Sequence, residues 1–283
     1  TAGHGFRIYL YPVYKMNSII HIPQAGPLKG VVHSIWQAEG EPSFQAEHII
    51  PKGIVEIIFD LGDPGTTEVL IGNTAQKLPG CFINGFNTLP VQLQLPRQQN
   101  FLGIRFHPGM IKQLLGVPAG TFSNQVVDLC LVHPEFHPRW HQLAEADGFR
   151  QRVAIISNWF QPAAGNRSPQ EEMLDAFLLN PYTEEYSVRN LARFLCYSSR
   201  QLSRKLYALT GMNTEDTLLY KRYLHAVHLM HTRDLSLTEV AFHSNFSDQS
   251  HFIRTFRSFA HLTPGDYRKM KGHMPGHFYQ NVR

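Results

Sequence analysis

The stretch FSDQSHFIRTFRSFAHLTPGDYR, from Phe246 to Arg268, combines aromatic residues at helical spacing with side chains that can contact phosphates and bases. Phe252 and Phe256 are four residues apart, so they fall on one face of a helix. Polar and basic residues occupy the remaining positions. The pattern predicts a helix that packs through its aromatic face and offers a basic face to an acidic partner.

A second copy of this pattern occurs earlier in the chain. The segment SVRNLARFLCYSSRQLSRKL from Ser187 aligns with SLTEVAFHSNFSDQSHFIRTF from Ser236 at an offset of 49 residues, which becomes 50 in the second half. Each copy has a Ser suited to an N-cap, a short helix, a tight turn and a second helix. This is the plan of a helix-turn-helix, whose second helix enters the major groove of DNA. We predict one unit at about 187–211 and another at about 236–260.

A third helix is predicted between the two units. Thr214 is placed to cap it, and Glu215 and Asp216 follow in the first turn, where the helix dipole favours acidic residues. The helical pattern runs to about His231. Such a helix would span about 27 Å. It would hold the two recognition helices near the roughly 34 Å repeat of B-DNA.

Residues 171–271 resemble the DNA-binding domain of the AraC/XylS family of bacterial transcription regulators. The resemblance is carried by FSDQSHF, RTFR and LTPGDYR in the second unit, SSRQLSRKL in the first, and RYLHAVHLM between them. It implies an all-α domain with two helix-turn-helix units and a linker helix, which binds double-stranded operator DNA. The chain departs from the turn glycines of the family at Cys196, Asn245 and His261. Asn and His tolerate a positive φ better than most residues do.

Eight residues are the candidate DNA contacts. Arginine can neutralise phosphates or fork onto guanine, glutamine can pair with adenine, and isoleucine can pack against a thymine methyl group. This chemistry selects Arg200, Arg204, Gln249, Ile253, Arg254 and Arg257, and the family resemblance adds Ser203 and Ser250.

The alternative interpretation is that these side chains are only the solvated faces of two amphipathic helices. The formal charge of the whole chain is +4. Residues 186–272 alone hold 13 Lys and Arg against 6 Asp and Glu, a net charge of +7. A basic block of this kind suits a polyanionic partner and favours DNA binding.

The first 165 residues predict a β-rich domain. Between Gly53 and Pro108 the runs IVEIIFDLGD, CFINGF, VQLQL and FLGIRF are separated by Gly, Pro and Asn, which is typical of an antiparallel barrel or sandwich. Helical patterns follow at 109–116 and at about 142–160. Loop composition at 161–170 places a boundary there, which gives domains 1–165 and 166–283. The fold class is α+β: a β-rich N-terminal barrel or sandwich with a few helices, then an all-α domain.

The family resemblance implies that the N-terminal domain senses a small-molecule effector or mediates contacts between proteins, including a homodimer. RNA polymerase would be a further partner of an activator. Inward-facing aromatic residues would either line an effector pocket or fill the core, and filling the core is the more common role; the candidates are Trp36, Phe59, Phe82, Phe86 and Phe106.

An enzyme fused to a DNA-binding tail is the third interpretation. The N-terminal half lacks the His-x-His pair of a metal-binding barrel, a Gly-rich phosphate loop and a GxSxG motif. His133, His137 and His141 recur every four residues, but two prolines interrupt that spacing. We therefore predict no enzyme, no catalytic or metal-binding residue and no cofactor.

Composition favours a soluble protein in the cytoplasm with no membrane partner. Hydrophobic residues make up 43% of the chain, yet no apolar run reaches the length of about 18 residues that a membrane span needs. The opening TAGHG lacks the pattern of a signal peptide. Three cysteines without a close pair argue against disulfides and predict three buried thiols.

Overall fold

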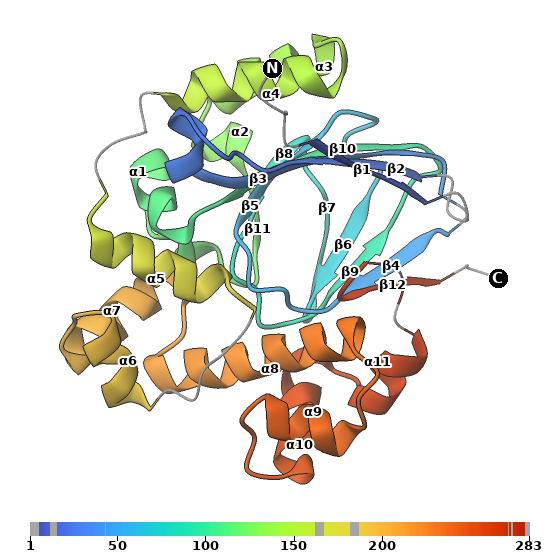
Figure 1. The fold of residues 1–283 in the computed structure, drawn as a ribbon. Helices are drawn as coiled ribbons and strands as arrows, with labels where there is room; N and C mark the ends of the chain where they lie inside the picture. Colours follow the sequence, from blue (N-terminus) through green and yellow to red (C-terminus); the bar gives the residue numbers. More distant parts are fainter. Residues whose placement is uncertain are drawn as a thin grey trace.

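The chain folds into an N-terminal region of two β-sheets and a C-terminal region of helices (Figure 1). The computed structural model describes residues 6–11, 16–42, 44–161, 167–181, 187–270, 272 and 274–280. The first sheet contains seven strands, in the spatial order β1 (Phe6–Tyr11), β2 (Met16–His21), β3 (Val32–Gly40), β10 (Gln99–Phe106), β5 (Glu56–Asp60), β8 (Cys81–Asn84) and β11 (Val126–Asp128). The second contains five, in the order β12 (His277–Gln280), β4 (Ala46–Ile49), β9 (Val91–Gln94), β6 (Glu68–Ile71) and β7 (Thr74–Lys77).

A row of isoleucines crosses the first sheet and fixes its register. Ile35, Ile104, Ile57 and Ile83 lie on β3, β10, β5 and β8 as successive cross-strand partners, and all four are fully buried. A slip of one residue would turn such side chains to the opposite face of the sheet. The apolar runs that the sequence predicts as strands therefore form the centre of this sheet.

The two sheets face each other and do not close into a barrel, since each keeps its own two edge strands. All strand pairs among the described residues are antiparallel. The predicted order, a β-rich N-terminal region followed by a helical region, is thus confirmed, but the C-terminal region is not all-α, because its last strand, β12, joins the second sheet.

Short helices cover the outer face of the first sheet. They are η2 (Pro27–Gly30), η3 (Pro108–Met110), α1 (Ile111–Leu115), η4 (Ala119–Phe122), α2 (Leu129–Val132), α3 (Phe136–Glu145) and α4 (Gly148–Phe160). The helical pattern predicted over about 142–160 is divided between the end of α3 and the whole of α4. The backbone of Ala146 is extended and Gly148 has a φ of 75°, so the helical conformation is interrupted between α3 and α4.

The C-terminal region contains α5 (Pro169–Leu179), α6 (Val188–Phe194), α7 (Ser199–Thr210), α8 (Thr214–Thr232), α9 (Leu237–His243), α10 (Gln249–Ala260) and α11 (Pro264–Met270). Helix α8 runs along one side of the sheets, with α9 and α10 on its far side (Figure 1). The predicted N-cap Thr214 is wrong. Asn213 is the N-cap, because its side chain accepts a hydrogen bond from the Asp216 amide at 2.9 Å, whereas Thr214 is buried as the first helical residue.

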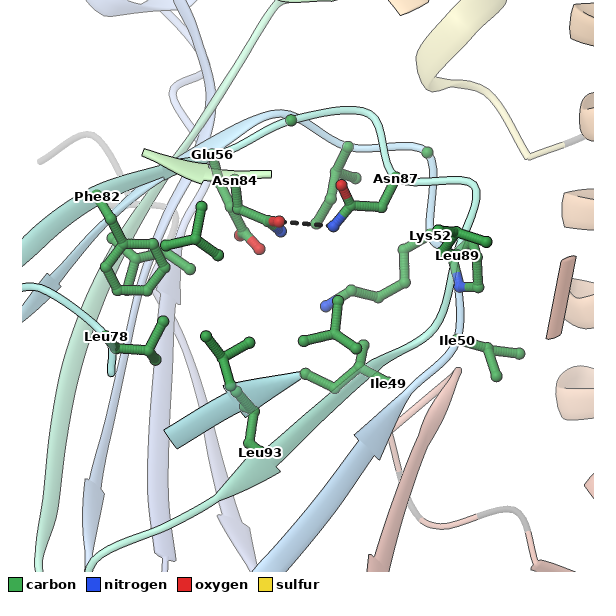
Figure 2. A pocket seen from close by; sticks show the side chains of 18 residues that line it. Ile49, Ile50, Lys52, Glu56, Leu78, Phe82, Asn84, Asn87, Leu89 and Leu93 are labelled. Atoms are coloured by element: carbon green, nitrogen blue, oxygen red, sulfur yellow. Dashed lines mark hydrogen bonds between the residues drawn. The ribbon is translucent and has the colours of Figure 1, made fainter. Parts of the chain in front are cut away.

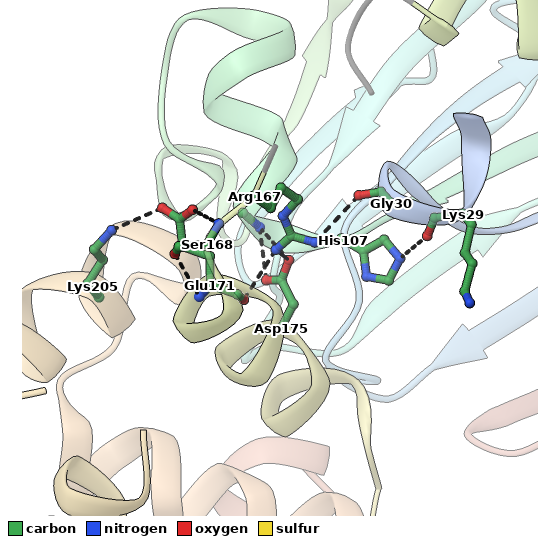
Figure 3. Close-up of polar contacts among 9 residues, drawn as sticks. Lys29, Gly30, His107, Arg167, Ser168, Glu171, Asp175 and Lys205 are labelled. Atoms are coloured by element: carbon green, nitrogen blue, oxygen red, sulfur yellow. Dashed lines mark hydrogen bonds and ion pairs between the residues drawn. The ribbon is translucent and has the colours of Figure 1, made fainter. Parts of the chain in front are cut away.

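Polar contacts join α5 to both regions (Figure 3). Arg167 forms an ion pair with Asp175, and Asp175 also accepts a hydrogen bond from the Gly109 amide at 3.0 Å. Burial raises the pKa of Asp175 to about 6, although Arg167 and the Gly109 amide oppose this shift. On the other side, Lys205 of α7 lies 3.4 Å from Glu171 of α5. Helix α5 therefore ties the first recognition helix to the N-terminal region.

The predicted burial of all three thiols is wrong. Cys81 is buried, Cys130 is partly exposed and Cys196 is exposed. Cys196 lies in a left-handed turn between two helices, with a φ of 55°, and its side chain is exposed there.

Two observations bear on other classes of protein. Within the described ranges, no helix is long and apolar enough to span a membrane. Nor do those residues contain a group of three or more His, Cys, Asp or Glu side chains arranged to hold a metal ion.

Candidate nucleic-acid interface and effector pocket

The two helical repeats begin each helix with the same kind of cap. Ser187 and Ser236 each accept a hydrogen bond from the amide three residues ahead, at the starts of α6 and α9. Ser198 and Asp248 do the same for α7 and α10. Such caps satisfy amides that have no partner inside the helix. The repeat in the sequence is therefore also a repeat of local structure.

The turn between the helices is also the same in both repeats. Cys196 and Asn245 have φ values of 55° and 60°. In each unit the next residue closes the turn through its amide, from Tyr197 to the Ala192 carbonyl at 2.8 Å and from Phe246 to Ala241 at 3.0 Å. Non-glycine residues rarely adopt a positive φ, so both turns depend on these backbone hydrogen bonds.

The candidate contact residues lie on the second helix of each unit. Leu202 and Leu206 bury one face of α7, and Phe252 and Phe256 bury the matching face of α10. The opposite faces carry the eight candidates. The exposed ones are Arg200, Arg204, Gln249, Ser250, Arg254 and Arg257, and the partly buried ones are Ser203 and Ile253. Their contact with DNA remains a prediction.

Thr238 takes part in the candidate interface although its position in the sequence does not indicate this. It lies on α9, and its hydroxyl donates a hydrogen bond to Oε1 of Gln249 at 2.8 Å. This bond holds the Gln249 amide so that its NH₂ group, and one lone pair of Oε1, remain available to a base. The two residues are 11 apart, so helical periodicity within either helix could not reveal the contact.

The first unit packs directly against the N-terminal region. A Cβ atom at Gly120 of η4 would lie 2.6 Å from the Tyr207 carbonyl and from the Gly211 amide at the end of α7. The hydroxyl of Ser123 donates to the Thr210 carbonyl at 2.9 Å. Only glycine allows the two backbones to approach this closely, so Gly120 lets η4 pack against the end of the first recognition helix.

The second unit is built on a chain of aromatic rings. Phe256 of α10 lies 5.4 Å from Tyr223 of α8 and 5.6 Å from Tyr267 of α11, measured between ring centroids. The linker helix in turn contacts the N-terminal region, where the Tyr220 hydroxyl donates to the Asn87 carbonyl at 2.7 Å. Aromatic pairs at these distances stabilise the folded protein by more than the burial of their surface area alone.

An open pocket lies between the two sheets (Figure 2). Its wall is mostly apolar and includes Leu78, Phe82 and Leu93. Figure 2 shows the Lys52 amine pointing into the pocket, with Glu56 and Asn84 beyond it. Ligand sites usually combine an apolar wall with a few polar groups in this way.

Of the five aromatic candidates, Phe82 lines the pocket. Phe59, Phe86 and Phe106 are fully buried in the core, and Trp36 donates a hydrogen bond to Glu56 at 3.0 Å. Lys52 carried no signal in the sequence, because a single Lys in a loop is ordinarily a surface residue.

Comparison with known proteins gives two family matches. Residues 191–270 match a family described as a helix-turn-helix domain, and residues 20–128 match a domain of unknown function, DUF6597. The transcriptional activator RhaS of Citrobacter koseri is 31% identical over 123 residues, which are 43% of this chain and 44% of RhaS. The C-terminal region is thus a helix-turn-helix domain similar to those of AraC/XylS-type regulators. The chain spans less than half the length of the curated relatives that it matches.

Two solved structures are also similar. ToxT from Vibrio cholerae is 13% identical, with 83% of this chain and 98% of ToxT covered and a TM-score of 0.48. The DNA-binding domain of AdpA, solved in complex with a target DNA, is 30% identical, with 36% of this chain and 92% of that domain covered and a TM-score of 0.33.

Proposed function

We propose that this protein is a sequence-specific, DNA-binding transcriptional regulator of the AraC/XylS type, controlled by a small molecule that binds between its two sheets. One observation supports the DNA-binding part most strongly. Two recognition helices of the same local geometry, α7 and α10, expose polar and basic faces and both pack against helix α8. At 19 residues α8 is about 28 Å long, which suits two successive major-groove segments.

The proposed DNA contacts divide between phosphates and bases. Arg200, Arg204, Arg254 and Arg257 would meet phosphates or guanine, while Gln249 would pair with adenine. Ser203 and Ser250 would donate hydrogen bonds to the DNA backbone, and Ile253 would pack on a thymine methyl group. We infer that the protein works in the cytoplasm, where bacterial DNA lies.

The effector would be a mostly apolar small molecule that presents a hydrogen-bond acceptor to Lys52. The supporting observation is that the ammonium group of Lys52 faces a mostly apolar pocket. A heat-stability screen against metabolites tests this, because a ligand at 100 times its dissociation constant stabilises a protein by about 2.7 kcal/mol. The variant Leu93→Trp, which fills the pocket, should lose the shift. If no compound shifts the wild type, the N-terminal region serves protein contacts alone.

One experiment tests both sequence-specific DNA binding and its control by an effector. Full-length protein is incubated with sheared genomic DNA at about 0.15 M salt, with and without cell extract, and the retained fragments are sequenced. Regulation by an effector predicts a few enriched sites whose retention changes with the extract, because the ligand favours one arrangement of the domains. Uniform weak retention under both conditions would contradict sequence-specific binding. Catalysis forms no part of the proposal; homodimerisation and contact with RNA polymerase remain predictions.

A further inference from the structure

The last strand of the chain, β12, is part of the N-terminal region. It follows α11, the final helix of the DNA-binding region, and pairs antiparallel with β4, with His277 opposite Ile49 and Phe278 opposite His48. The Ile50 amide donates to the Gly276 carbonyl at 2.9 Å and extends the pairing. The chain thus returns from the helices and becomes the edge strand of the second sheet (Figure 1).

His277 connects β12 to the pocket. Its Nδ1 lies 2.6 Å from Oε1 of Glu47, and its Nε2 lies 3.1 Å from Nζ of Lys52. A carboxylate can only accept and an ammonium group can only donate. The ring is therefore neutral, with its proton on Nδ1 directed at Glu47 and its Nε2 lone pair accepting from Lys52.

The contact with His277 matters for Lys52 because the neighbouring acidic side chain already has other partners. Glu56, the nearest acidic residue along the chain, is engaged by Arg105 at 3.3 Å and by Trp36 at 3.0 Å. Lys52 takes part in none of the ion pairs found among the described residues. Burial lowers the pKa of Lys52, and Glu56 partly opposes that shift. An ammonium group has three donors, so a bond to His277 leaves donors that can face the pocket.

The neighbouring residue in β12 connects to the second helix-turn-helix unit. Successive side chains of a strand point to opposite faces. Phe278 is buried and lies 5.4 Å from the ring of Tyr267, which in turn lies 5.6 Å from Phe256 of the recognition helix α10. The Tyr267 hydroxyl also accepts a hydrogen bond from the Gly276 amide at 3.3 Å.

We propose that His277 is a positioning residue of the effector pocket, which holds the Lys52 ammonium group in place, and that β12 couples this pocket to the second recognition helix. The inference rests on the proposed function in taking the pocket as the effector site. A ligand that engages Lys52 acts on a group that β12 also holds. Docking of the strand and binding of the ligand are then linked, and each changes the other by the same factor.

Amide hydrogen exchange in the full-length protein tests the link between Lys52 and β12 without a ligand. Lys52→Met and His277→Ala should each speed exchange at 46–50 and 276–280 by about tenfold, the value expected for losing one hydrogen bond to a charged group. His277→Gln should stay within about threefold of the wild type, because the Gln amide can also accept from Lys52 and donate to Glu47. Lys77→Met, at an exposed lysine of β7, is the matched control.

Two results of this comparison would overturn the proposal. If Lys52→Met leaves exchange in β12 unchanged, the pocket lysine does not hold the strand. If His277→Gln behaves like His277→Ala, the ring serves packing and does not position Lys52.

A probe extends the test to the occupied pocket. The probe is 2-naphthamide, an apolar molecule with a neutral acceptor, and its binding is followed by fluorescence. Bound probe should slow exchange in β12 of the wild type and have no such effect in Lys52→Met. Binding to the wild type with unchanged β12 exchange would overturn the coupling. Failure of the probe to bind would count against the proposed effector site, while the exchange comparison of the variants would still decide the role of His277.

Discussion

The two helix-turn-helix units share a local backbone plan but are supported in different ways. The first unit rests directly on the N-terminal region, where Gly120 and Ser123 meet the end of α7. The second is packed through aromatic rings onto α8 and α11, and α11 leads into β12. A duplicated helix-turn-helix motif can thus be attached to one β-sheet region by two routes. We propose that a change between the sheets would reach the second unit through β12.

The largest expected effect is the loss of a buried ring in the second unit, and it distinguishes how the two helix-turn-helix units are attached. Phe256→Ala should lower the free energy of unfolding by about 3 to 5 kcal/mol, because a fully buried ring is removed. It should also speed amide exchange in β12. Leu206→Ala, the matched change in the first unit, should cost about 2 to 5 kcal/mol and leave β12 unaffected. Denaturant titration and exchange measure both quantities. Equal loosening of β12 in the two variants would show that the supports are not separate.

Gly120→Ala should weaken the attachment of the first unit. The added methyl group meets backbone atoms at 2.6 Å, which cannot move as a side chain can, so a cost of about 1 to 3 kcal/mol is expected. Faster exchange should be confined to η4 and α7. Gly265→Ala is the control, because its Cβ would meet one atom, Oγ1 of Thr263, at 3.7 Å. Faster exchange in α10 of the Gly120 variant would contradict direct support of the first unit alone.

A smaller effect is expected for Thr238→Val, which keeps the shape of the side chain and removes the hydroxyl that donates to Gln249. Loss of one exposed hydrogen bond should cost about 0.5 to 1 kcal/mol in DNA binding and relax preference at one base position of the second half-site. Competition binding with single-base variants of the selected DNA measures this. Thr238→Ser should restore the preference. A uniform loss at all positions would mean that Thr238 does not orient Gln249.

The sequence predicted the helical region closely, since its signals are local. Ser caps, apolar pairs four residues apart and a repeat of 49 residues specify each helix within a short window. The unusual turns could also be predicted from the sequence, because Cys196, Asn245 and His261 stand where the family has glycines. All three have a positive φ. The N-cap at Asn213 was missed by one residue, since both Asn and Thr can cap a helix.

The pocket and the return of β12 could not be predicted from local patterns. Lys52 and His277 are 225 residues apart, and nothing in the spacing of either residue indicates that they meet. Phe82 could not be distinguished from Phe59 or Phe86, because lining a pocket and filling a core require the same side chain. Contacts of this kind depend on how the sheets and helices pack, which propensity and periodicity do not report.

We propose that two units of one chain read two parts of one operator, and selection of genomic DNA at about 0.15 M salt with the wild type, Arg200→Ala and Arg254→Ala tests this. We expect a wild-type motif in two parts, about one helical turn apart. Each variant should lose about 1 to 3 kcal/mol of binding and relax preference in one part only, a different part for each arginine. A motif with a single part, or the same altered positions in both variants, would contradict it.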